Sequence, residues 1–192
     1  MNASSVVIQP RGFPNNSAMA LKLPQGDAGV VLTIAAMTAI VHDAVQNSAI
    51  VRDVAAALQR SASRDGRDVG EEVYWWLVQR VRFQRDPQGV EKLRTPDQML
   101  TTIHSAGFDK VDCDELATLA AALLRVMGKF PAFIVMSLQP KRPFHHVFYG
   151  LYDVRAGAAA AGPLPGIKPF NPQERTPPGQ WPDGARFKAF RI

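Results

Sequence analysis

The sequence has 192 residues, 46% of them hydrophobic and 20% charged, which fits one globular domain with extensions and argues against a disordered chain. Its formal net charge is +5, but basic and acidic residues are interleaved along most of the chain, so nucleic acid is not an expected partner. The single cysteine excludes an internal disulfide framework, and a cytoplasmic location is expected.

The first predicted segment is an extended N-terminal arm, residues 1–28. It holds three prolines, two glycines and three asparagines, and it has no sustained hydrophobic period. The apolar stretch 28–41 comes next and is shorter than the roughly 20 residues that a membrane-spanning helix needs. It also lies too far into the chain for a signal peptide, so the pattern predicts a buried helix and no membrane partner.

Three helices are predicted in the first half of the chain. They cover residues 30–46, 50–59 and 71–83, and the polar run 61–68 breaks the pattern between the last two. The apolar residues of the first and third helices recur at spacings of three and four, as a buried face requires: Ile34, Met37, Val41 and Val45, then Val73, Trp76, Leu77 and Val81.

Two further helices begin at recognisable capping sequences. After a turn at 86–89, Thr95 precedes Pro96 and stands three residues before Gln98, which predicts a helix start. Asp112 and Glu115 repeat this spacing ahead of a run of leucines, and Gly128 predicts the end of that helix.

The last third of the chain predicts strands. Residues 130–138 and 144–152 flank a proline-containing turn and suggest a hairpin, and 167–171 suggest a third strand after a segment of small residues. A proline-rich, basic C-terminal tail is predicted over 176–192. Helices followed by strands indicate an α+β fold, with N-terminal helices packed on a small antiparallel sheet.

Cys113 is the leading candidate for a nucleophile. If Asp112 caps its helix, Cys113 lies in the first turn, where the positive end of the helix dipole favours a thiolate. Backbone N–H groups of that turn can also donate to the oxyanion of a tetrahedral intermediate. Asp112 and Asp114 are the predicted capping and supporting residues, and no metal or cofactor is expected, because one cysteine and two adjacent histidines lack the separated ligand pairs of a zinc site.

A thiol nucleophile needs a base, and His145 and His146 lie on the second predicted strand. Strand alternation alone does not decide which of them faces Cys113. Asp153 and Asn171 are the candidates for a third residue that orients the imidazole. Asn171 fits better, because it lies on the next strand rather than at the end of the same one.

Three stretches in this order resemble the bacterial and phage branch of the transglutaminase-like superfamily, which has a papain-like cysteine fold: EEVYWWLVQRVRFQRDPQGVEKLRTPDQML, VDCDELATLAAALLRVMGKFPAFIV and HHVFYGLYD. The resemblance covers roughly residues 30–175. It implies that Cys113 is the nucleophile and His146 the general base, with Asn171-Pro172 in place of the family's final Asp-Pro. It also implies a domain over 29–175, with a helical lead-in at 29–66 and a catalytic core at 67–175.

The expected function is therefore a cysteine-dependent acyl-transfer enzyme that hydrolyses a peptide or amide in a peptide or protein substrate. The alternative is a structural protein of a phage virion or of its assembly, with or without activity. In that case the protein would be located in the virion, and the N-terminal arm would contact protein partners in the particle.

Overall fold

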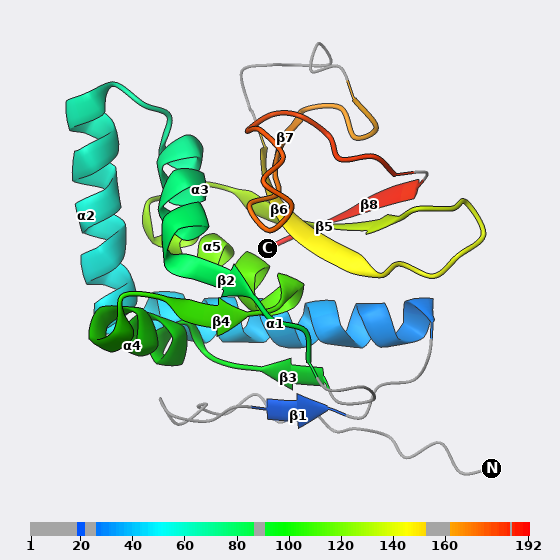
Figure 1. Cartoon of the computed structure of the whole chain (residues 1–192), viewed down its shortest axis with the longest axis horizontal. Coiled ribbons are helices and arrows are strands. Elements are labelled where there is room, and N and C mark those ends of the chain that lie inside the picture. The colour runs from blue at the N-terminus through cyan, green and yellow to red at the C-terminus, as the bar shows by residue number, and fades with distance from the viewer. Residues whose placement is uncertain (1–18, 22–25, 87–90, 153–161, 185) are drawn as a thin grey trace.

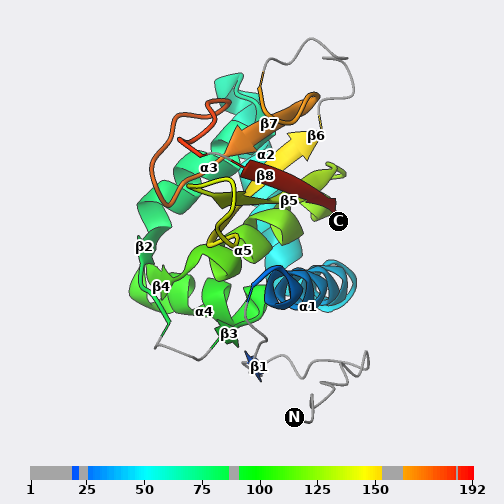
Figure 2. The ribbon, with the colours of Figure 1, turned by 90° about the vertical axis from the view of Figure 1, so that its right-hand side faces the viewer.

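The structure is a computed structural model that describes residues 19–21, 26–86, 91–152, 162–184 and 186–192. The described residues form five helices and a four-stranded antiparallel sheet, together with two short strand pairs. The helices are α1 (Asp27–Asn47), α2 (Ala49–Asp65), α3 (Val69–Arg80), α4 (Pro96–Ala106) and α5 (Cys113–Val126). In Figures 1 and 2 the sheet lies above α1, and in Figure 1 α2 and α3 stand beside it. The expected α+β class is confirmed.

The large sheet has the strand order β7-β6-β5-β8. Its strands are β5 (Pro131–Ser137), β6 (His146–Tyr152), β7 (Ile167–Phe170) and β8 (Arg186–Arg191). Two smaller pairs lie apart from it: β1 (Met19–Leu21) is antiparallel to β3 (Glu91–Leu93), and β2 (Val81–Phe83) is parallel to β4 (Asp109–Val111). In Figure 1 the β1–β3 pair lies below α1, on the side away from the large sheet.

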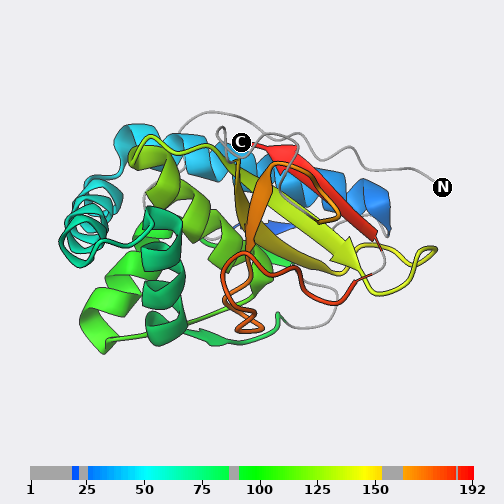
Figure 3. The ribbon, with the colours of Figure 1, turned by 90° about the horizontal axis from the view of Figure 1, so that it is seen from above.

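Helix α5 is the centre of the fold. It contacts the other four helices as well as β5 and β6, and its residues 114–124 are all buried. A helix that is buried on every side must be apolar on every side, which explains its run of alanines and leucines. Seen from above, the sheet covers one end of the helical layer, while α2 and α4 extend beyond it (Figure 3).

The predicted helix ends are confirmed where a capping sequence marks them. Thr95 and Gln98 form a reciprocal capping box at the start of α4. After α5, Gly128 adopts a φ of 71°, and the N–H of Lys129 donates to the carbonyl of Leu124, 3.0 Å away, which closes the helix.

Two helix predictions were wrong in extent. Helix α2 continues through the polar run to Asp65. A surface helix tolerates polar residues on its exposed face as long as its other face is buried, and in α2 Leu58 and Ala62 lie on that buried face. Helix α3 ends at Arg80, and residues 81–83 form β2, because pairing with β4 outweighs the local helical spacing of Val81.

The C-terminal segment contains a strand that the sequence patterns did not reveal. Residues 186–191 form β8, which pairs with β5 from Ala132↔Arg191 to Ser137↔Arg186. The prolines before it and its three basic residues conceal the alternation of a half-buried edge strand. The predicted hairpin of β5 and β6 is confirmed, and β7 adds to β6 as the third strand.

The two faces of the large sheet pack against different parts of the protein. Alternate residues of the strands, including Val147 and Tyr149, pack against the helices in the main core. The residues between them, including Phe148 and Met136, form a second cluster under Trp181. The direction of a side chain along β6 therefore determines whether it packs in the main core or in the second cluster.

Helix α1 has the length and mean hydropathy of a membrane-spanning helix. It also packs along α5, and Met37 and Val41 on its inner face are fully buried. A buried core helix meets the same length and hydropathy criteria, so the packing agrees with the predicted buried helix.

Candidate functional site

Cys113 is the first residue of α5 and is half-buried. The carboxylate of Asp112 accepts a hydrogen bond from the N–H of Glu115 (3.2 Å), as expected of a capping residue, and Asp114 accepts from the same N–H (2.9 Å). The thiol therefore sits in a capped first turn, at the positive end of a helix of 14 residues.

Arg94 anchors this first turn. Its guanidinium donates to both carboxylate oxygens of Glu115, at 2.7 and 2.9 Å, and to Asp109, with a shortest distance of 2.9 Å. A further donor reaches the carbonyl of Lys110 at 2.7 Å. One side chain thus joins the segment before α4 to β4 and to the start of α5.

Charge balance explains why these groups can be buried. Glu115 and Asp109 are only 4% and 5% exposed, so each needs a partner to offset the loss of hydration. Burial raises the pKa of the Glu115 carboxyl, and the hydrogen bond and charge of Arg94 oppose that rise. The sequence analysis did not identify Arg94, because its partners lie 15 and 21 residues further along the chain.

His146 and Asn171 are joined directly. His146 Nε2 lies 3.1 Å from Asn171 Oδ1, and the two residues are 7% and 1% exposed. His146 is the first residue of β6, and Asn171 follows the last residue of β7, the neighbouring strand. Burial lowers the pKa of His146, whereas the bond to Asn171 and the charge of Glu174 oppose this lowering.

The sequence also offered His145 as the base and Asp153 as the orienting residue. His145 is exposed, and Asp153 lies outside the described residues. The N–H of His145 donates to the carbonyl of Met136 (3.1 Å), the residue that pairs with His146 across the ladder. Two consecutive residues thus oppose one, as in a β-bulge, a device that redirects side chains at the ends of strands.

The alternation of β6 gives His146 a defined direction. Its ring stacks on Phe148, with centroids 5.8 Å apart, and Phe148 in turn meets Trp181. This is the face away from α5. Val147, next in the chain, points to the other face and joins the core cluster against which Cys113 packs. A proton transfer between Cys113 and His146 therefore requires that the two side chains meet at the end of β6, where His146 begins the strand.

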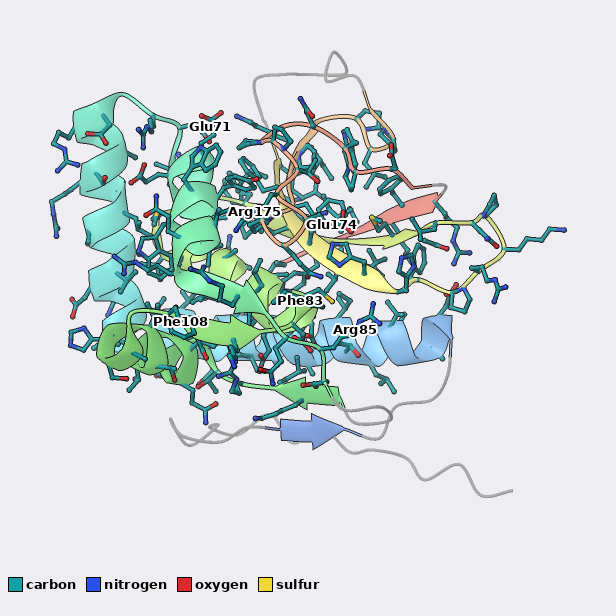
Figure 4. The ribbon with its side chains drawn as sticks, viewed as in Figure 1. Glu71, Phe83, Arg85, Phe108, Glu174 and Arg175 are labelled. Carbon is teal, nitrogen blue, oxygen red and sulfur yellow. The ribbon has the colours of Figure 1, made fainter. Side chains whose placement is uncertain are left out.

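Exposed side chains surround this part of the molecule. In Figure 4 Glu174 and Arg175 come from the turn after β7, and Phe83 from β2. Phe83 is 48% exposed and pairs with Val111, two residues before Cys113. Phe83 is not evident from the sequence as a residue of this region, because it lies on a short strand within a segment of helical spacing.

No family model, curated protein or solved structure matches this chain.

Proposed function

We propose that this protein is a cysteine-dependent peptide or amide hydrolase of the transglutaminase-like type, with Cys113 as nucleophile, His146 as general base and Asn171 as the residue that orients His146. The observation that carries this proposal is the buried hydrogen bond between His146 and Asn171, on strands of a sheet that packs against α5. The helices-then-sheet order and the capped position of Cys113 support the same assignment.

In this mechanism the Cys113 sulfur bonds to the carbonyl carbon while its proton passes to His146. The positive end of α5 stabilises the negative oxygen of the tetrahedral intermediate. The carbon–nitrogen bond then breaks, and the imidazolium returns the proton to the leaving amine. Water, deprotonated by His146, attacks the thioester and releases the acid and the thiol.

The environment of His146 suits a general base. Because burial lowers its pKa below the ordinary value of 6.5, the ring is neutral at pH 7 and able to accept a proton. Hydrolysis is proposed rather than cross-linking, because water is an acceptor that needs no second binding site.

The test is the rate at which iodoacetamide alkylates Cys113 at pH 7, compared with a small thiol such as N-acetylcysteine. We expect Cys113 to react about 10-fold faster or more, as an activated thiol does. His146→Ala should remove this advantage. His145→Ala, which changes the adjacent exposed histidine, is the matched control and should retain it.

The proposal fails if Cys113 reacts no faster than the small thiol and Cys113→Ala leaves every peptidase and amidase activity of the protein unchanged.

A further inference from the structure

Glu174 lies in the tight turn that follows β7. The N–H of Arg175 donates to the carbonyl of Pro172 (3.2 Å), and the N–H of Thr176 donates to the carbonyl of Asn171 (3.2 Å). Arg175 has a φ of 54°, a left-handed conformation that is unfavourable for a non-glycine residue. This turn brings the Glu174 carboxylate back to Asn171, whose Nδ2 donates to Oε2 at 2.9 Å.

The carboxylate determines which way the Asn171 amide faces. An ionised carboxylate can only accept hydrogen bonds, so the amide must present its NH₂ group to Glu174 and its oxygen to His146. The amide oxygen can also only accept. His146 Nε2 must therefore carry the hydrogen, and in the neutral ring Nδ1 then bears the lone pair.

We propose that Glu174 is a positioning residue that, through Asn171, holds His146 in the tautomer with the hydrogen on Nε2 and the basic lone pair on Nδ1. Glu174 does not touch the reacting atoms. This inference rests on the proposed function for its catalytic meaning, although the tautomer itself is a property of the folded protein.

Without the carboxylate, the amide has two orientations of nearly equal shape. In the flipped orientation its NH₂ group faces Nε2, which must then be the acceptor, and the hydrogen moves to Nδ1. A base with its hydrogen on the wrong nitrogen cannot accept the thiol proton at that nitrogen. The bond to Glu174 removes this ambiguity.

Glu174 also acts through its charge. Its carboxylate favours protonation of His146, whereas burial and the nearby His145 disfavour it. Glu174 is exposed, so solvent screens this effect.

The experiment is ¹⁵N NMR of the histidine ring nitrogens in the full chain, with His146 assigned from the spectrum of His146→Gln. The wild type should show the hydrogen on Nε2. Glu174→Ala should shift His146 to a mixture of tautomers. Glu174→Gln keeps the size of the side chain but can donate as well as accept, so it no longer fixes the orientation of the Asn171 amide. It should also give a mixture of tautomers, and the loss of the charge should lower the His146 midpoint.

Glu71→Gln is the matched control. Glu71 is another surface carboxylate that contacts β7, through Lys168 at 2.7 Å, and it also appears in Figure 4. Its removal should leave the tautomer of His146 unchanged. Circular dichroism of each variant checks that the fold is kept.

The inference is overturned if folded Glu174→Ala keeps the hydrogen wholly on Nε2. Alkylation of Cys113 at pH 7 then separates the two proposals. If the wild-type thiol is unreactive but the tautomer shifts in Glu174→Ala, the hydrolase proposal fails and the role of Glu174 stands. If the wild-type thiol is reactive and the tautomer does not shift in Glu174→Ala, the hydrolase proposal stands and the role of Glu174 fails. Where both stand, Glu174→Ala should lower the alkylation rate in proportion to the fraction of His146 that no longer carries its hydrogen on Nε2.

Discussion

At the scale of single residues, the feature that distinguishes this molecule is a histidine buried next to an amide. A buried imidazole resists protonation, because the charged ring would lose its hydration. The pKa of His146 is therefore lowered from its ordinary 6.5. The charge of Glu174 opposes this lowering, and the charge of His145 adds to it. The pKa of His146 falls because burial has the largest effect.

This direction predicts a loss of stability in mild acid. Below pH 6.5 the unfolded chain binds a proton at His146 that the folded chain resists, so the free energy of unfolding falls as the pH falls. Between pH 7 and pH 5.5 this one group should therefore contribute a measurable loss of stability.

Urea unfolding of the wild type and of His146→Gln at both pH values measures this contribution. The variant lacks the titrating ring, so its loss of stability over the same interval should be smaller by that amount. An equal loss in the two proteins would mean that His146 does not resist protonation.

At the scale of elements, local signals were sufficient where an interaction joins neighbours in sequence. Thr95 and Asp112 cap helices as predicted, because a capping side chain needs only the three residues that follow it. Arg94 shows the opposite case. Glu115 has the spacing of a capping-box partner for Asp112, yet its carboxylate binds Arg94 instead. No local sequence pattern predicts this contact.

The Arg94 network yields a prediction about stability. Arg94→Met leaves Glu115 and Asp109 buried without their cation and should lower the free energy of unfolding by about 3 kcal/mol or more. The control is Arg64→Met. Arg64 pairs with Asp65, and the two side chains are 74% and 30% exposed, so its loss should have only a small effect on the free energy of unfolding.

Urea unfolding at pH 7 compares the two variants. Similar small losses would show that the Arg94 network contributes no more than a surface ion pair.

At the scale of the whole molecule, the sequence predicted the class, the order of the five helices and the strands β5, β6 and β7. It did not predict the short strands β1 to β4 or the edge strand β8 of the large sheet. Strand β8 is separated from β5 by about fifty residues, and six registered pairs join them. Composition hid this pairing, because the prolines and positive charges of the C-terminal segment resemble those of an unpaired tail. The turn at Glu174 escaped prediction for a related reason, since it depends on the left-handed conformation of Arg175.

Removing β8 should therefore destabilise the large sheet, whereas removing an unpaired tail would not. A chain that ends at Gly184 loses the β5 pairing and the cover that Phe187 gives to the second cluster, so we expect a large loss of soluble, folded protein. A chain that ends at Arg191 keeps all of β8 and is the control. Thermal melting and size-exclusion chromatography distinguish the outcomes, and equal melting temperatures would contradict a structural role for β8.

The Arg94 network also bears on how long the candidate nucleophile stays in place. The first turn of a helix usually frays, opening and closing far more often than the protein unfolds. Here the carboxylate of Glu115 binds a guanidinium that also binds β4, so the first turn cannot open without breaking contacts in two other segments. We therefore expect the first turn of α5, and Cys113 with it, to open far less often than the end of a helix that lacks such contacts.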